Sequence, residues 1–170
     1  MKEIKFRAWD GQKMIYDGDK VWPDHLANMR HYLSGASVTN KGVEVWVYES
    51  QLPHATDKHF DHRTGIPFKN LMQFTGLCDK NGKEIFEGDI VEQESITTYP
   101  GEYGGEIDLL YTGEVVIIPS KGACLKRPNV IDRLEEDRKW KCNSYKNVVS
   151  YRCEIIGNIF ETPELLKEDA

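Results

Sequence analysis

The residues best suited to chemistry are grouped in the segment 51–67, which combines three histidines with acidic side chains. The candidate metal ligands are His54, His59 and His62, with Asp57 and Asp61 between them. Imidazole nitrogens and carboxylates bind divalent metals such as zinc, and a metal-bound water can hydrolyse an ester. Their spacing matches no established zinc motif such as H-E-x-x-H. A solvated polar loop explains the same composition, so we expect no bound metal and no other cofactor.

Nucleophilic catalysis has little support in the sequence. The four cysteines are scattered and form no C-x-x-C pair; they are Cys78, Cys124, Cys142 and Cys153. No G-x-S-x-G motif occurs, and the glycine-rich tract 101–105 precedes no helix that could bind phosphate. We therefore expect a protein without enzymatic activity. A metal-dependent hydrolase that uses the histidine segment is the third hypothesis.

A second group of residues, between 120 and 152, could bind nucleic acid. It combines an excess of basic side chains with aromatic rings that could stack on bases. The candidates are Lys126, Arg127, Trp140, Lys141, Tyr145, Lys146 and Arg152. Acidic residues from Asp132 to Asp137 interrupt the group, and a solvated helix of mixed charge accounts for 131–141 equally well. The formal net charge of −6 and the pI of about 5.4 oppose attraction to a phosphate backbone.

Protein binding, including self-association, is the hypothesis that we place first. Small β domains expose strand edges to which extended peptides or further subunits can add. Aromatic residues such as Trp9, Trp22 and Trp46 could contribute to such a surface, although they could equally fill the core. No apolar run is long enough to cross a membrane and no secretory signal is visible, so we expect a cytoplasmic protein with reduced cysteines.

The clearest structural signal is the stretch 71–92, in which two apolar runs flank the tetrapeptide DKNG at 79–82. Asn-Gly predicts a β-hairpin, because both residues tolerate the positive φ that a tight turn needs. A second break follows at 87–89 and precedes another strand. Asp89 is expected to hydrogen-bond the backbone of this turn and so to define the kink.

The N-terminal part is predicted to be rich in strands, with one short helix. Alternating polarity predicts strands over 4–9, 13–16 and 43–48. Leu26, Met29 and Leu33 recur at helical spacing, so a helix is expected over 25–33. The segment 51–67 has no periodicity and is predicted to be an exposed loop that contains a domain boundary.

The C-terminal part is predicted to contain further strands and two insertions. Dense β-branched residues predict a strand over 113–118, and 153–160 predicts a closing strand with a bulge at its glycine. The glycine-rich stretch 94–112 is expected to be an irregular excursion between strands. The charged segment 130–141 is expected to be a second insertion, whose apolar residues could line one face of a helix. Thr162 is expected to cap a short C-terminal helix.

Three stretches of the sequence resemble the signatures of the YopX family, which occurs in Gram-positive bacteria, phages and prophages. They are IKFRAWD near the start, MQFTGLCDKNGKEIFEGDIV in the middle and EIIGNIFETPELL near the end. The resemblance implies a mainly β fold with an SH3-like barrel in the C-terminal part, and it supplies no catalytic residues. We therefore expect a β-rich domain with one short helix over 1–67, and over 68–170 an SH3-like β-barrel with long insertions and a short C-terminal helix. Such a protein would be a phage or prophage accessory protein of unknown function that acts by binding.

Overall fold

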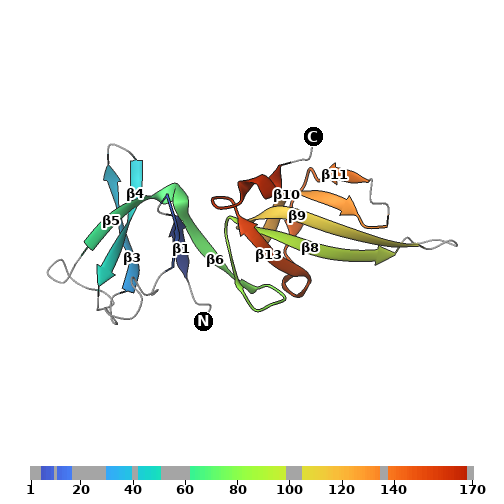
Figure 1. The fold of residues 1–170 in the computed structure, drawn as a ribbon, viewed down its shortest axis with the longest axis horizontal. Coiled ribbons are helices and arrows are strands. Elements are labelled where there is room, and N and C mark those ends of the chain that lie inside the picture. Colours follow the sequence, from blue (N-terminus) through green and yellow to red (C-terminus); the bar gives the residue numbers. More distant parts are fainter. Residues whose placement is uncertain are drawn as a thin grey trace. The chain divides into compact units, whose positions relative to one another are not determined.

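The protein is mainly β in the computed structural model, which describes residues 5–9, 11–16, 30–39, 42–50, 62–98, 105–134 and 138–167 (Figure 1). The strands are β1 (Phe6–Trp9), β2 (Met14–Tyr16), β3 (Arg30–Thr39), β4 (Gly42–Ser50), β5 (His62–Pro67), β6 (Leu71–Cys78), β7 (Glu84–Phe86), β8 (Asp89–Thr98), β9 (Glu106–Ile118), β10 (Gly122–Asp132), β11 (Lys139–Lys141), β12 (Lys146–Asn147) and β13 (Cys153–Asn158). Short 3₁₀ helices are η2 (Phe68–Asn70), η3 (Ser150–Arg152) and η4 (Pro163–Leu166). The prediction of a mainly β fold is confirmed. No helix in the described ranges has the length and hydropathy needed to traverse a bilayer.

The chain divides into two compact units, Met1–Gln73 and Phe74–Ala170. In the first unit β4 lies between β3 and β5, and β1 lies between β2 and the beginning of β6, with all neighbours antiparallel. Ala8 of β1 pairs with Ile15 on one side and with Leu71 on the other. These three residues form a small apolar core, in which Ala8 and Ile15 are buried. Arg7, on the other face of β1, is buried as well, so both faces of this strand are covered at its centre.

The helix predicted over 25–33 is wrong in its last four residues, and 25–29 lie outside the described residues. Residues 30–33 begin strand β3, where Leu33 pairs with Val47 of β4. Three apolar residues at helical spacing are a weak local preference, and pairing with a strand rich in valine overrides it.

The loop predicted over 51–67 is also wrong in its last part, because residues 62–67 form β5. Ile66 pairs with Val45, so β4 has a partner on each side. Backbone pairing of this kind needs no apolar periodicity, which is why the sequence did not reveal it. The remainder of the segment lies outside the described residues, and the boundary at residue 67 stays a prediction.

The hairpin between β6 and β7 is confirmed. Leu77 pairs with Ile85, and Gly82 adopts a φ of 83°. Asn81 does not share this conformation, because among the described residues other than glycine only Arg127 has a positive φ. The glycine alone therefore supplies the left-handed position of the turn. Asp89 accepts a 2.8 Å hydrogen bond from the backbone N–H of Phe86, as predicted for the following kink.

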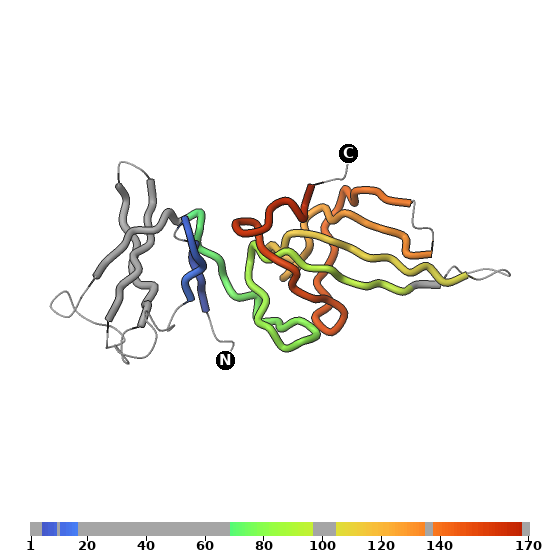
Figure 2. The backbone as a smooth tube through the Cα atoms, viewed as in Figure 1, coloured from blue at the N-terminus to red at the C-terminus, as the bar shows by residue number. Residues whose placement is uncertain are grey.

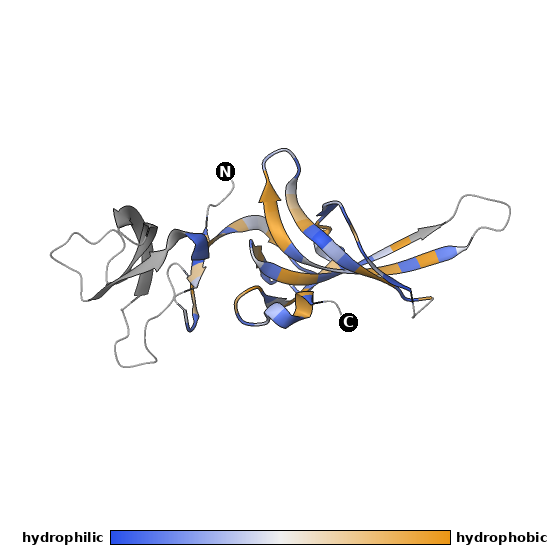
Figure 3. Ribbon diagram, turned by 90° about the horizontal axis from the view of Figure 1, so that it is seen from above, coloured by the Kyte–Doolittle hydropathy of each residue, from blue (hydrophilic) through white to orange (hydrophobic). Residues whose placement is uncertain are grey.

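One curled sheet forms most of the second unit, in the order β11-β10-β9-β8-β13, with β12 also paired to β10. Figure 2 shows this backbone from yellow-green to red, and the curl fits a barrel-like fold. The core on one face consists of Ile85, Val91, Val115, Leu125 and Cys153, all fully buried. Apolar and polar residues alternate along the strands of this unit (Figure 3), so the opposite face is left more polar.

The two segments predicted to be insertions are largely β in the described residues. β8 continues to Thr98 and β9 begins at Glu106, so that the glycine-rich stretch joins two long paired strands. Residues 129–132 belong to β10, and the three-residue strand β11 pairs with them. A helix of mixed charge is therefore wrong for these residues. Lysines are common on the edge strands of sheets, as in β11. The backbone pairing of β11 with β10 overrides the weak helical pattern of this segment.

The chain reaches η4 through the predicted bulge, which lies between Ile155 and Gly157 of β13. Pro163 opens the helix as predicted, but the element is 3₁₀ and Thr162 makes no side-chain cap. The Thr162 hydroxyl instead accepts a 3.1 Å hydrogen bond from the backbone N–H of Asn158 and lies 3.2 Å from its carbonyl oxygen. A Cβ added at Gly157 would collide with this hydroxyl, so glycine is needed for η4 to pack here.

Candidate binding groove

Two adjoining hollows form a groove on the second unit. Their volumes are about 410 Å³ and about 260 Å³, and Thr112, Asn129 and Lys141 line both. We call them together the basic groove, because five cationic side chains line them. These are Lys126, Arg127, Lys139, Lys141 and Lys167. Among the described residues, two carboxylates also line the groove, Glu92 and Glu114, so described cations outnumber described carboxylates in its lining.

The groove lies on the face of the sheet opposite the core. The strand register pairs Glu92 with Thr112, Thr112 with Asn129, and Asn129 with Lys141. Residues that are paired directly across strands share a face, so these four side chains form one row across β8, β9, β10 and β11. Val130, next to Asn129 in sequence, is buried on the core side.

The 3₁₀ helix η4 covers this outer face and forms one wall of the groove. Leu165 and Lys167 line the larger hollow, and Leu166 lines the smaller one. The Asn129 side-chain amide donates a hydrogen bond of 3.5 Å to the Leu166 carbonyl oxygen, which joins the wall to the floor. Ile131 and Ile156 add apolar surface to the larger hollow. The lining of the groove therefore combines apolar, polar and cationic side chains.

A β-bulge in β10 brings two of the cations to the groove. The register shifts between Lys126 and Asn129, so Arg127 and Pro128 stand opposite the single residue Gly113. Arg127 has a φ of 42° at this bulge. A Cβ at Gly113 would lie 3.0 Å from the Pro128 Cβ, so only glycine fits easily opposite the proline. The bulge bends the strand and redirects its side chains, which is a common use of such irregularities.

The ammonium group of Lys126 lies 3.1 Å from a carboxylate oxygen of Glu114. The Lys126 side chain is half-exposed, and ion pairs in this setting contribute only about 0–1 kcal/mol. An anionic ligand could therefore compete with Glu114 for the lysine at small energetic cost. This leaves the groove able to bind a carboxylate or phosphate together with an apolar group.

The sequence model for the family described as YopX protein matches residues 5–167. The chain belongs to the YopX family. The resemblance of the three sequence signatures is thereby confirmed. A crystal structure of protein EF1440 from Enterococcus faecalis is similar to this YopX-family protein, with 21% identity and a TM-score of 0.44. That similarity covers 98% of this chain and 100% of that one. No protein of curated function matches the chain.

The structure of the YopX-family protein brings together four of the seven residues predicted for nucleic acid. Lys126, Arg127, Trp140 and Lys141 all line the basic groove. The other three, Tyr145, Lys146 and Arg152, line neither hollow. Register places Trp140 opposite Val130 and Lys141 opposite Asn129.

The exposed aromatic side chains of this region lie against cations. The Arg138 guanidinium lies 5.7 Å from the Trp140 ring centroid, and the Arg152 guanidinium lies 5.4 Å from that of Tyr151. Lys121 lies 5.9 Å from the ring of Tyr145. Such cation–π contacts account for the interleaved basic and aromatic sequence without a nucleic-acid ligand.

Sequence reasoning missed several residues of the groove. Lys139 belongs to the basic group between 120 and 152 but is not one of the seven candidates, and Lys167 lies beyond that group. Glu92, Thr112 and Asn129 were not considered at all. Each lies on a different element, so only the antiparallel register brings them together. A possible signal was the alternation of Lys139 and Lys141 around Trp140, which is typical of a strand with one cationic face.

The histidine candidates are not assembled into a site by the described residues. His62 lies in β5, whereas His54 and His59 lie outside the described part of the chain. Within that part, no group of three or more histidine, cysteine or acidic residues could hold a metal ion. The proposal of a metal site in this segment therefore stays a sequence-based prediction.

The four cysteines are free, and their surroundings differ. Cys153 and Cys124 are buried, and burial raises the pKa of the Cys153 thiol to about 11. Cys142 is half-buried, and hydrogen bonds to the side chain and backbone of Ser144 lower its pKa below the ordinary value. Its sulfur lies 3.3 Å from the Ser144 hydroxyl oxygen. Cys78, at the end of β6, is exposed.

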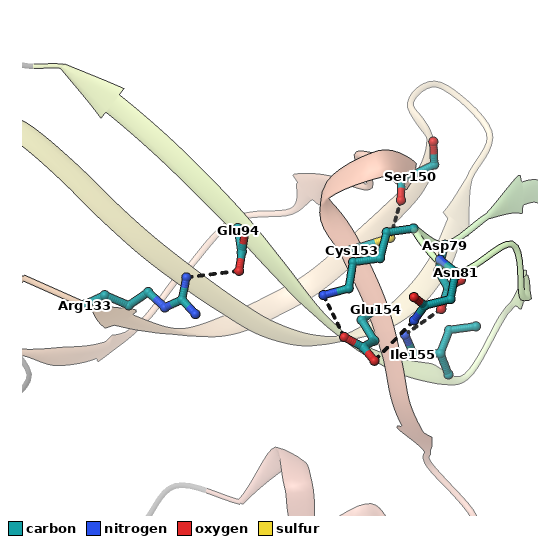
Figure 4. Close-up of polar contacts among 9 residues, drawn as sticks. Asp79, Asn81, Glu94, Arg133, Ser150, Cys153, Glu154 and Ile155 are labelled. Atoms are coloured by element: carbon teal, nitrogen blue, oxygen red, sulfur yellow. Dashed lines mark hydrogen bonds and ion pairs between the residues drawn. The ribbon is translucent and has the colours of Figure 1, made fainter.

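A buried carboxylate connects the hairpin to the closing strand (Figure 4). Asp79 accepts hydrogen bonds from the backbone N–H groups of Asn81 (2.9 Å), Lys83 (2.9 Å) and Ile155 (3.2 Å). Burial by itself would raise the pKa of Asp79, but these N–H groups and the nearby Lys83 charge lower it overall. Glu154, beside Ile155, pairs with Lys80 at 2.7 Å. The Asp79 carboxylate therefore has a structural role.

Proposed function

We propose that this YopX-family protein is a non-enzymatic accessory protein of a phage or prophage, and that it acts by binding another protein in the basic groove. The observation that carries the proposal is the groove itself, which apolar side chains and five cations line together. A groove of about 410 Å³ is large enough to enclose several side chains of a partner. Binding to nucleic acid is the second candidate, favoured by the presence of Trp140 and Lys141 in the groove.

Two features support the protein partner over nucleic acid. Two carboxylates lie in the groove, and the whole chain has a net charge of −6. A long polyanion would therefore meet repulsion outside the groove.

The test is affinity capture from lysates of the bacterium that carries the gene, with variants that reverse the groove's charge. In the double variant Lys139→Glu, Lys167→Glu, two of the cations that line the larger hollow become acidic. The control is Lys121→Glu, Arg152→Glu, which makes the same change of charge at exposed positions outside the groove. We expect wild type and control to retain the same protein and the groove variant to lose it. Equal capture by all three would contradict the proposal, and capture abolished by nuclease would favour the second candidate.

A further inference from the structure

The basic groove concentrates positive charge on a unit that is otherwise strongly acidic. Residues 74–170 contain 12 lysines and arginines against 19 aspartates and glutamates. Within the described part of this unit, five of the cations line the groove, but only two acidic residues do, Glu92 and Glu114. Such a field attracts a short anionic group into the groove and repels a long polyanion from the surrounding surface. The ligand should therefore carry a few negative charges over a short length.

The interior of the groove adds a requirement for apolar groups. Ile131, Ile156 and Leu165 line the larger hollow, and Leu165 is 36% exposed. A free inorganic anion would leave this surface in contact with water. A ligand that alternates acidic and apolar groups would contact both the cationic and the apolar side chains that line the groove.

One edge of the groove is the outer strand β11. The backbone N–H of Asp132 donates to the Arg138 carbonyl oxygen at 3.1 Å, and that of Cys142 donates to the Pro128 carbonyl oxygen at 2.8 Å. In an antiparallel pair, the residues between such bonded positions direct their peptide groups away from the partner strand. The peptide groups of Lys139 therefore face the outer edge of the sheet. An extended peptide can add at such an edge by main-chain hydrogen bonds.

Arg127 supplies an independent argument for an anion. It is the only residue other than glycine with a positive φ in the described part of the chain. Glycine or asparagine is the usual choice at such a position, because a longer side chain is strained there. Within the same described part, Arg127 forms no ion pair with a carboxylate. Strained backbone of this kind is associated with functional sites, and the planar guanidinium matches a carboxylate in a bidentate manner.

We propose that the basic groove binds an extended acidic peptide segment of a partner protein, added alongside β11. Its carboxylates pair with Arg127 and the lysines, and its apolar side chains enter the hollow lined by Ile131, Ile156 and Leu165. This inference rests on the proposed function and names the chemistry of the partner.

The test is an NMR titration of the full chain, labelled with ¹⁵N, by a synthetic peptide in which aspartate or glutamate alternates with isoleucine or valine. We expect saturable shifts at the amides of Lys139, Lys141 and Asn129. A peptide with lysine in place of the acidic residues, and one with a central proline that cannot pair as a strand, are expected to bind at least about tenfold more weakly.

Arg127→Gly is the decisive variant. It removes the guanidinium and places glycine where the backbone has a positive φ, so the melting temperature should not fall. We expect about tenfold weaker peptide binding, with partial recovery in Arg127→Lys, which keeps the charge but not the bidentate shape. Unchanged affinity in Arg127→Gly would overturn the proposal. Tighter binding of oligothymidylate than of the acidic peptide would also overturn it.

The two proposals can fail separately. If the groove-charge variant loses its captured protein but the acidic peptide produces no shifts at β11, the groove binds a protein of different chemistry, and only this inference is wrong. If the groove-charge variant also captures the same protein as the wild type, the proposed function is wrong as well.

Discussion

At the scale of single residues, a few polar side chains do the work of holding the turns and strand ends together. Asp79 satisfies three backbone N–H groups, two in its own turn and one on β13. Gln93 is fully buried and is satisfied by the backbone of the chain between β12 and η3, with a 2.7 Å bond from the Val149 N–H. Buried polar groups are tolerated only when they are satisfied in this way. Removing the Asp79 or the Gln93 side chain would therefore leave the backbone N–H groups bonded to it without a hydrogen-bond partner.

Asp79→Asn is expected to destabilise the protein by about 1–3 kcal/mol at neutral pH, because an amide cannot accept all three hydrogen bonds. The hydrogen bonds lower the folded-state pKa of Asp79, so its contribution is fully present above the unfolded-state pKa and is lost as the pH falls through the folded-state value. Urea unfolding at several pH values measures this. The difference between wild type and variant should shrink under acid conditions.

The matched control is Glu106→Gln, at an exposed carboxylate that begins β9. It should leave the midpoint of unfolding almost unchanged at every pH. A stability difference for Asp79→Asn that stays constant down to acid pH would show that the charge of Asp79 is not what stabilises the hairpin.

The cysteines are expected to divide into two reactive and two protected thiols. Cys142 has a lowered pKa and Cys78 is exposed, so both should react with a thiol reagent such as Ellman's reagent in the native state. Cys124 and Cys153 are buried, and the raised pKa of Cys153 keeps that thiol protonated near neutral pH. These two should react only in denaturant. Rapid reaction of all four thiols in buffer would contradict the burial of the second pair.

At the scale of elements, the position of η4 decides whether the groove has a wall. The helix is short and contains no buried residue, so its own hydrogen bonds contribute little to its stability. The hydrogen bond from the Asn158 N–H to the Thr162 hydroxyl holds η4 in place, and the absence of a side chain at Gly157 leaves room for it. The wall of the groove thus depends on one glycine in the neighbouring strand.

Gly157→Ala is expected to destabilise the protein by about 1–3 kcal/mol, because the new methyl group would occupy the place of the Thr162 hydroxyl and approach Leu165. Urea unfolding measures the change. Gly105→Ala is the control, since a Cβ there meets nothing within 4 Å, and it should change the stability by less than about 0.5 kcal/mol. Equal effects of the two substitutions would mean that η4 does not pack against β13 as described.

At the scale of the whole molecule, charge is distributed unevenly along the chain. Residues 1–73 contain 10 lysines and arginines against 9 acidic residues, whereas residues 74–170 carry a large acidic excess. The basic groove is therefore a local exception on the more acidic unit. Electrostatic attraction at long range depends on this overall distribution, and contacts within the groove depend on the local one.

We expect the full chain not to bind a short DNA duplex, even at a low salt concentration of about 50 mM, where contacts to phosphates are strongest. Fluorescence anisotropy with a labelled duplex measures this, and the same titration with single-stranded RNA extends it to the other nucleic acid. Binding that weakens steeply with added salt would show that the groove overcomes the acidic surroundings. It would make nucleic-acid binding the first hypothesis.

What the sequence determined by itself was local. Gly82 predicted the reversal between β6 and β7, the alternation over 4–9 predicted a strand, and the YopX signatures predicted family and a mainly β fold. Each of these predictions depends on residues that are neighbours in the sequence, where backbone preferences and an alternation with a period of two can be recognised directly. The groove was decided by the tertiary structure alone. Antiparallel register and one bulge place Glu92, Arg127 and Lys167 around the same hollows, and pairing over such separations leaves no mark on local sequence.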